Sequence, residues 1–201
     1  MKKKLFKTLG IIACAVLLIG GSIAGTYAYL TSTATTQNTF TVGNVKITLN
    51  ESYNDELGSF VEDEYSYKLI PGRTYIKDPT INVLEGSEDC YLFVKIEDGI
   101  SGIQDTKTIA TQLADNGWKV LGGEGNDVVY YYTNGNSGNP VTERTSVNVF
   151  SSFKILGSVK NEDLEAYASA RIVVTAYAVQ ADGFEDVYDA WAHTFGASTN
   201  S

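Results

Sequence analysis

Apolar and polar residues alternate along most of the chain, which is the pattern of β-strands with one buried face. Glycine, proline and asparagine mark turns between the alternating segments, and the acidic stretch 50–64 is expected to be a surface loop. The pattern predicts strands within 40–49, 65–70, 74–84, 90–96, 118–121, 128–133, 146–156 and 168–179. About eight short strands joined by turns favour an antiparallel β-sandwich, with a jelly roll as its variant.

Two segments break the alternation and predict short helices. In the first, over 105–116, apolar residues recur at helical spacing, and Asp105 or Thr106 can cap its start. The second is an amphipathic helix over 184–195 near the C-terminus. Its buried side would carry Val187, Trp191 and Phe195. The sequence therefore predicts a mainly β fold with two small helices.

The first 28 residues have the pattern of a secretory signal peptide. Four lysines precede an apolar run over 10–24, which is shorter than the roughly 20 apolar residues that a membrane-spanning helix needs. Thr26 and Ala28 place small residues where a signal peptidase reads, so we expect cleavage between Ala28 and Tyr29. One alternative is a transmembrane anchor. The other is a lipoprotein attached through Cys14, but the apolar stretch before Cys14 is too short for a lipoprotein signal. The signal predicts a secreted protein of the cell surface or extracellular matrix, without a membrane anchor after cleavage.

Residues 29–38 form a short segment that is rich in threonine and carries no charge. It has no apolar period that would let it fold alone, so we expect a flexible N-terminal arm. Threonine nevertheless favours strands, and such an arm can add to the edge of a sheet. The sandwich domain would then occupy 39–201.

Charge and cysteine content narrow the possible partners. The predicted signal holds four of the 15 basic residues and none of the 24 acidic ones, which leaves a net charge of −13. Such a surface repels nucleic acid and anionic lipid. Beyond the signal there is one cysteine, so no disulfide can form within the mature chain, and Cys90 is expected to be a buried strand residue.

The sequence contains no specific catalytic constellation. His193 is the chain's one histidine, which excludes the paired histidines of a His-Glu-x-x-His zinc protease. Cys90 and His193 are conceivable as a nucleophile and base, but that requires a buried strand thiol to be reactive. The acidic clusters lack the ligand spacing of a calcium loop. We therefore expect no enzyme activity, no metal and no cofactor.

Two further possibilities remain open. Tyr130, Tyr131, Tyr132 and Trp118 could line a glycan site in a monomeric adhesin or carbohydrate-binding sandwich. Lys95 and Asn148 lie in predicted strands, where an isopeptide crosslink between a lysine and an asparagine is possible.

Several short stretches together resemble one family. They are 25–31 (GTYAYLT), 38–43 (NTFTVG), 71–73 (PGR), 77–81 (KDPTI), 86–92 (GSEDCYL), 176–184 (AYAVQADGF) and 190–191 (AW). Their order and spacing are similar to those of the TasA/camelysin family, whose signal peptides are processed by a SipW-type signal peptidase, and to its BsaA-like biofilm pilins of Gram-positive bacteria. Cys90 stands where an alanine is expected.

The resemblance implies a jelly-roll subunit that polymerises head-to-tail into extracellular fibres of a biofilm matrix. In that family the N-terminal segment of one subunit lends a strand to the next. Its partners would be further copies of itself, the signal peptidase, and other matrix or minor fibre proteins. Camelysin relatives are often described as metalloproteases, which stays an alternative although this sequence offers no ligand set. The residues of the donor strand would be Leu30, Ser32, Ala34, Phe40 and Val42.

Overall fold

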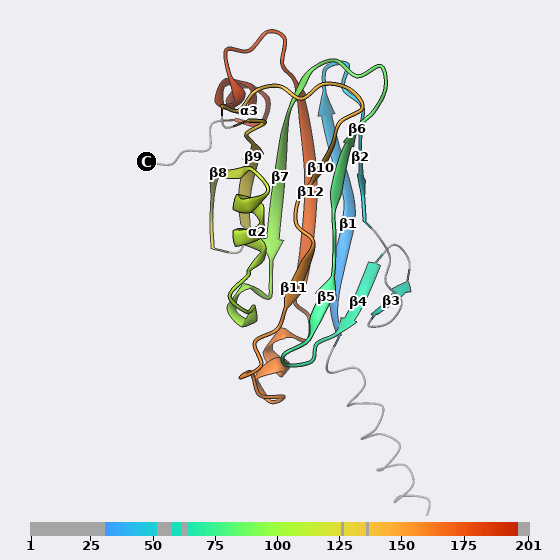
Figure 1. Cartoon of the computed structure of the whole chain (residues 1–201), viewed down its shortest axis with the longest axis vertical. Coiled ribbons are helices and arrows are strands. Elements are labelled where there is room, and N and C mark those ends of the chain that lie inside the picture. Colours follow the sequence, from blue (N-terminus) through green and yellow to red (C-terminus); the bar gives the residue numbers. More distant parts are fainter. Residues whose placement is uncertain (1–30, 52–57, 62–63, 126, 136, 197–201) are drawn as a thin grey trace, which may run out of the picture.

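The structure of the chain is a computed structural model that describes residues 31–51, 58–61, 64–125, 127–135 and 137–196. Within these residues the chain is mainly β, and its sheets form a sandwich, as the alternation predicts (Figure 1). The strands are β1 (Thr31–Val42), β2 (Ile47–Asn50), β3 (Gly58–Val61), β4 (Glu64–Lys68), β5 (Thr74–Ile76), β6 (Thr80–Val83), β7 (Cys90–Asp98), β8 (Trp118–Glu124), β9 (Asp127–Tyr132), β10 (Ser146–Asn148), β11 (Ser152–Lys154) and β12 (Arg171–Gln180). The helices are η1 (Ser101–Ile103), α2 (Ile109–Asp115), η2 (Asp163–Tyr167) and α3 (Val187–Phe195).

One large sheet forms the first layer of the sandwich. Its seven strands follow the order β3-β4-β1-β12-β7-β9-β8, and β1, β12 and β7 run side by side along the long axis of the molecule (Figure 1). The second layer consists of two small sheets, β10-β6-β2 and β11-β5. The strand pairs are antiparallel, as expected, except that β1 pairs with β12 in parallel.

The core lies between the two layers. On β12, Val174, Ala176 and Ala178 point inward, as alternate residues of a strand must. Branched side chains of the small sheets, such as Ile81 and Val147, pack against them. The inward side chains from both layers are buried in one continuous cluster, so the sandwich is held together by apolar packing rather than by crosslinks.

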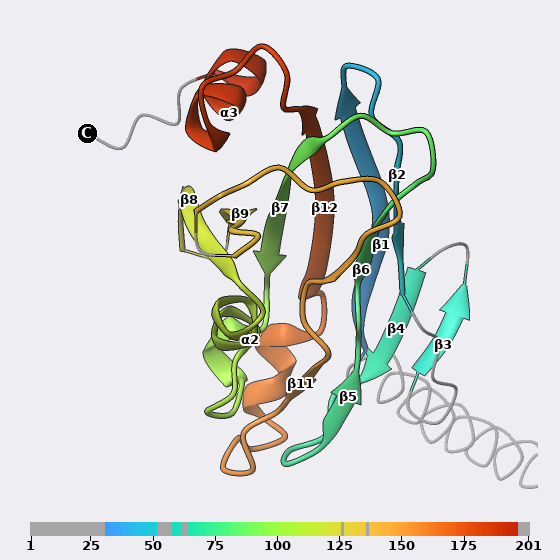
Figure 2. The same ribbon diagram turned by 45° about the horizontal axis from the view of Figure 1, so that its top comes forward.

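A second, smaller cluster covers the outer face of the large sheet. Helix α3 lies at one end of the long strands, as both views show (Figures 1 and 2). Its Val187 and Trp191 pack on Phe93 and Val179, and the rings of Trp191 and Phe93 are 4.9 Å apart. The helix begins at Asp186, whose Oδ1 accepts hydrogen bonds from the first-turn N–H groups of residues 188 and 189.

Three local expectations need correction. Helix α2 is capped by Thr108, whose Oγ1 accepts the N–H of Thr111 at 3.2 Å, while Asp105 instead forms an ion pair with Lys154 at 2.7 Å. The segment 146–156 is not one strand, because it crosses from the β10 sheet to the β11 sheet. The expected loop 50–64 includes β3, which pairs with β4.

The predicted signal peptide and its cleavage site, Thr26, Ala28 and Tyr29, lie outside the described residues. Among the residues that the structure does describe, no helix is both long and apolar enough to cross a bilayer.

Candidate assembly site

Strand β1 fills a slot between two other strands of the large sheet. It runs parallel to β12, in a register from Thr33 opposite Arg171 to Val42 opposite Val179. On its other side it runs antiparallel to β4. The strand is thus inserted between two strands that come later in the chain, and it is held there by main-chain pairing on both sides.

The two halves of β1 are held differently. Strand β4 pairs with residues 31–35 only, and the register with β12 shifts between Thr36 and Asn38. Residues 39–42 therefore pair on one side alone and are exposed. Phe40 is 51% exposed, although its ring stacks on that of Tyr177 at a centroid distance of 5.3 Å.

The structure places residues 31–38 of the expected arm in strand β1, which ends at Val42. The physical reason is that β12 and β4 each offer a row of unpaired N–H and C=O groups, which a threonine-rich segment can satisfy. Of the expected donor residues, Ser32, Ala34, Phe40 and Val42 lie on β1, and Leu30 lies outside the described residues.

A row of aromatic rings leads from β1 to α3. We call Phe40, Tyr177, Trp191 and Phe195 the aromatic strip. The Tyr177 ring lies 5.5 Å from that of Trp191 and 5.1 Å from that of Phe195. Phe195 stays 38% exposed at the end of the helix. The strip therefore connects the weakly held half of β1 to the helix at that end of the sheet.

The turn after β1 is a tight one. Gly43 has φ +87°, and a Cβ there would lie 2.6 Å from Cβ of Gln180, so this turn requires glycine. The side-chain Oε1 of Gln180 accepts the N–H of Asn44 at 3.1 Å. Val45 and Ile47 follow directly and are buried in the main core. Only two residues thus separate β1 from the core of its own subunit.

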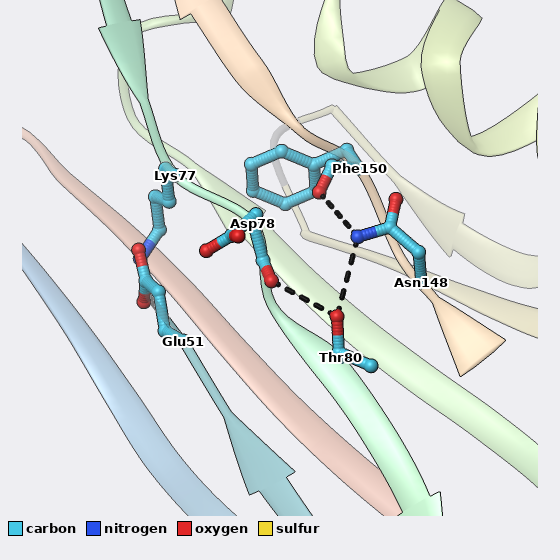
Figure 3. A network of polar contacts seen from close by, with 6 residues as sticks. All are labelled: Glu51, Lys77, Asp78, Thr80, Asn148 and Phe150. Carbon is cyan, nitrogen blue, oxygen red and sulfur yellow. Dashed lines mark hydrogen bonds and ion pairs between the residues drawn. The ribbon is translucent and has the colours of Figure 1, made fainter. Parts of the chain in front are cut away.

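A buried polar network fixes the small sheets opposite the large one (Figure 3). The ammonium of Lys77 is fully buried, and its Nζ lies 2.8 and 3.0 Å from the two carboxylate oxygens of Glu51. Burial lowers the pKa of Lys77, and the carboxylate of Glu51 opposes that shift. The alternation did not reveal this pair; a lysine within an otherwise apolar extended segment was the available signal.

Asn148 is the second centre of that network. Its Nδ2 donates to Oγ1 of Thr80 at 3.3 Å and to the carbonyl of Phe150 at 3.1 Å (Figure 3), and its Oδ1 accepts from Nδ2 of Asn116 at 3.0 Å. Lys95, its suggested crosslinking partner, points to the other face of the large sheet and lies 3.4 Å from Glu97. The structure does not bring Lys95 and Asn148 together.

The suggested nucleophile and base are also apart. Cys90 is fully buried between the two layers, whereas His193 lies on the exposed side of α3, with Nδ1 2.9 Å from Oδ1 of Asp189. Burial, helped by the charge of Asp89, raises the pKa of Cys90 to about 12. The thiolate that a nucleophile requires is therefore not populated near neutral pH.

The aromatic residues suggested for a glycan site face inward. Trp118, Tyr130 and Tyr131 are all buried, and only Tyr132 is half-buried. The indole of Trp118 donates to the carbonyl of Asn148 at 3.1 Å, which fixes it in the core. These side chains hold β8 and β9 in place and offer no stacking surface for a sugar.

The half-buried acidic side chain at the end of β7 serves local structure. Asp98 accepts from Nε2 of Gln104 at 2.7 Å and from the N–H of Ile100 at 3.1 Å, which closes the turn after β7. Across the described ranges, no group of three or more histidine, cysteine, aspartate or glutamate side chains is placed to hold a metal ion.

The sequence was also compared with known proteins. No protein-family model matches it, and no curated protein does either.

Proposed function

We propose that this protein is a secreted structural subunit that polymerises head-to-tail into extracellular fibres of a biofilm matrix. Each subunit would give its β1 to the next one, where it would fill the slot between β12 and β4. The observation that carries the proposal is the position of β1: an N-terminal strand inserted in the large sheet, parallel to β12 and joined to its own core by two residues.

An N-terminal strand of this kind can be exchanged without changing any of its contacts. A second copy carries the same β1, so it can offer the same main-chain hydrogen bonds to β12 and β4. When each copy passes its strand on to a further copy instead of exchanging it back, the assembly does not close and builds a filament.

The pairing energy of a donated β1 is sufficient to hold two copies together in a filament. Nine residues of β1 have register partners on β12. At about 1 kcal/mol net for each ladder hydrogen bond, a strand of this length contributes several kcal/mol. That is comparable to the stability of a small domain, about 5–15 kcal/mol. An empty slot, in contrast, would leave a row of unpaired groups on β12, which favours filling it.

The resemblance to the TasA/camelysin family supports the same assignment, because it implies fibre formation by strand donation. The predicted signal peptide supports secretion. The alternatives lose support from the geometry: the aromatics of the suggested glycan site are buried, and the cysteine and histidine are on different faces of the large sheet.

The test is electron microscopy of the protein secreted by a Gram-positive host that carries a SipW-type signal peptidase. We expect fibres from the wild-type chain and none from a chain that lacks residues 29–42, which removes the whole of β1. A synthetic peptide of residues 29–42 should bind the truncated chain and keep it soluble. It should not restore fibres, because the peptide carries no folded domain that could accept a further strand. Normal fibres from the truncated chain would contradict the proposal.

Two controls make the result specific. Removal of residues 197–201 shortens the other terminus and should leave the fibres unchanged. A peptide of the same composition in scrambled order should bind the truncated chain less well, because the register of Phe40 on Tyr177 is lost.

A further inference from the structure

We infer that the exchanged segment is the whole of β1, that Gly43–Asn44 is its hinge, and that the aromatic strip thereby becomes a contact between two copies of this chain. The inference rests on the proposed function and specifies which surfaces of the two copies meet. It follows from the pairing of β1, the length of the link to the core, and the exposed rings at that end of the sheet.

Two places in β1 could act as the hinge. One is the register shift between Thr36 and Asn38, and the other is the turn at Gly43. A hinge at the register shift would leave residues 39–42 on their own subunit. Those residues are weakly anchored, since they pair with β12 alone and all of them are exposed.

The turn at Gly43 marks the true change in burial. On its N-terminal side residues 39–42 of β1 are exposed, and on its C-terminal side Val45 belongs to the core. Gly43 adopts a left-handed conformation and Asn44 is held by Gln180, so this turn is specific to the closed arrangement within one subunit. When the link is extended, both constraints disappear, which makes Gly43–Asn44 the point where the chain can open.

The short link decides where the second copy lies. Three peptide steps join Val42 to Val45, and fully extended they span at most about 11 Å. A donor whose Val42 pairs with Val179 of the acceptor therefore has its own core at that distance from the acceptor's sheet. The two bodies must touch at the end of the sheet where α3 lies.

Exposed apolar side chains are present on both surfaces that meet. The acceptor offers Phe195, which is 38% exposed beside the half-buried Tyr177, and the incoming β1 places Phe40 on Tyr177. Next to the donor's hinge, Leu84 is 40% exposed, and its N–H donates to the carbonyl of Lys46 at 2.9 Å. Contact with the donor would cover Phe195 and Leu84, which a single subunit leaves open to water.

Pairs of cysteines can locate the hinge. In a Cys90→Ala background, one variant carries Thr35→Cys with Val173→Cys, and another carries Phe40→Cys with Tyr177→Cys. Both are register partners of β1 and β12, on either side of the register shift. A third variant, Lys95→Cys with Thr175→Cys, joins β7 and β12 within one body and serves as the control. Assembled protein is treated with a short bismaleimide and separated under denaturing conditions.

We expect ladders of covalent multimers from the first two pairs and monomers from the control. A ladder from the Thr35 pair with monomers from the Phe40 pair would place the hinge at the register shift, which would overturn this inference and leave the proposed function intact. Monomers from both pairs would overturn the inference and the proposed function together.

A second variant tests the contact itself. Phe195→Glu should raise the concentration needed for assembly about tenfold, because an exposed ring that becomes buried between copies would be replaced by a charge. Val120→Glu is the matched control, since Val120 is 59% exposed on β8, an edge strand of the large sheet, and does not belong to the aromatic strip. Equal assembly of the two variants, each with wild-type thermal unfolding as a subunit, would show that the strip is not a contact.

Discussion

Strand β12 has two neighbours in the large sheet, and they are held in different ways. On one side β7 runs antiparallel to it in an unbroken register from Cys90 to Asp98. Its side chains from Cys90 to Val94 are buried on both faces of the sheet. On the other side β1 runs parallel, with a shifted register, and its second half is exposed. The first neighbour is bound by side-chain packing and main-chain pairing together, whereas residues 39–42 of the second are bound mainly by pairing.

In the proposed fibre, this difference would separate the body of the subunit from the strand that joins it to the next copy. Apolar burial depends on the particular shapes that surround each side chain, so β7 cannot leave without opening both clusters. Main-chain pairing is the same for any copy of the strand. A strand that is attached by pairing can be exchanged between copies at little cost, whereas a packed strand cannot. The predictions below test this contrast.

The largest effect is expected from Phe93, which is fully buried on β7 against Trp191. Phe93→Ala should lower the free energy of unfolding by about 3–5 kcal/mol, because it leaves a cavity in the outer cluster. The matched change in the other neighbour, Phe40→Ala, should cost the isolated subunit less than about 1 kcal/mol, because that ring is half exposed. Urea denaturation of both variants measures the contrast, and equal losses would contradict it.

The packed strands β7 and β12 could be predicted from the sequence, whereas the pairing partners of β1 could not. Alternation located β7 and β12 well, because their buried faces require it. The amphipathic pattern located α3, which begins three residues later than expected at Val187. Residues 146–156 also alternate, but a period of two does not reveal that β10 and β11 join different sheets. Pairing partners depend on contacts that are distant in sequence.

The position of β1 in the sheet could not be predicted from the sequence for a related reason. Threonine repeats indicate that residues 31–38 can form a strand, but they do not state which strand will receive them. The parallel pairing with β12 and the cover by β4 depend on two segments that lie elsewhere in the chain. The buried pair of Lys77 and Glu51 was missed because each charge is compensated only by the fold.

The second prediction concerns alkaline pH, where β7 should lose stability. Burial keeps the pKa of Cys90 at about 12, against 9.0 for the free thiol. Between pH 9 and 12 the unfolded chain therefore releases a proton that the folded chain retains, so stability falls as pH rises. This difference in pKa lowers the free energy of unfolding by about 4 kcal/mol near pH 12.

Urea denaturation at pH 8, 9, 10 and 11 measures this loss. Cys90→Ala should flatten the curve between pH 9 and 10. Part of the slope should remain at higher pH, because burial and the hydroxyl of Tyr188 raise the pKa of Tyr131 to about 12 as well. Strand β1 carries no titratable side chain of its own. An unchanged slope in Cys90→Ala would show that the thiol does not contribute.

The third prediction concerns pairing alone. Thr33 has register partners on both sides, Arg171 on β12 and Ser66 on β4. Thr33→Pro removes a backbone N–H and should weaken the pairing of β1 by about 1–3 kcal/mol, with a sharp reduction in fibre length by negative-stain microscopy. Near-ultraviolet circular dichroism of the body should remain unchanged. Thr33→Val keeps the N–H and the strand preference, so its fibres should be normal; shortened fibres there would implicate the side chain instead.

The smallest and most selective effect is expected at Gly43. An alanine with φ near +87° costs about 1–2 kcal/mol, and its Cβ would also press against Gln180. Both costs belong to the closed turn, in which β1 folds back on its own subunit. If the link opens on exchange, the extended form does not carry them. Gly43→Ala should therefore destabilise the isolated subunit and at the same time increase the assembled fraction, by roughly tenfold for each 1.4 kcal/mol.

Gly86 provides the matched control for that prediction. It has φ +72° in a turn beside Lys46, close to the same end of the molecule, but it lies within the body and outside the link. Gly86→Ala should lower the stability of subunit and fibre alike, because its turn has the same conformation in both. Sedimentation of assembled from free protein, beside thermal unfolding of the free subunit, separates the two cases. If Gly43→Ala lowers assembly as Gly86→Ala does, the turn stays closed in the fibre, and the chain opens elsewhere in β1 or does not exchange the strand.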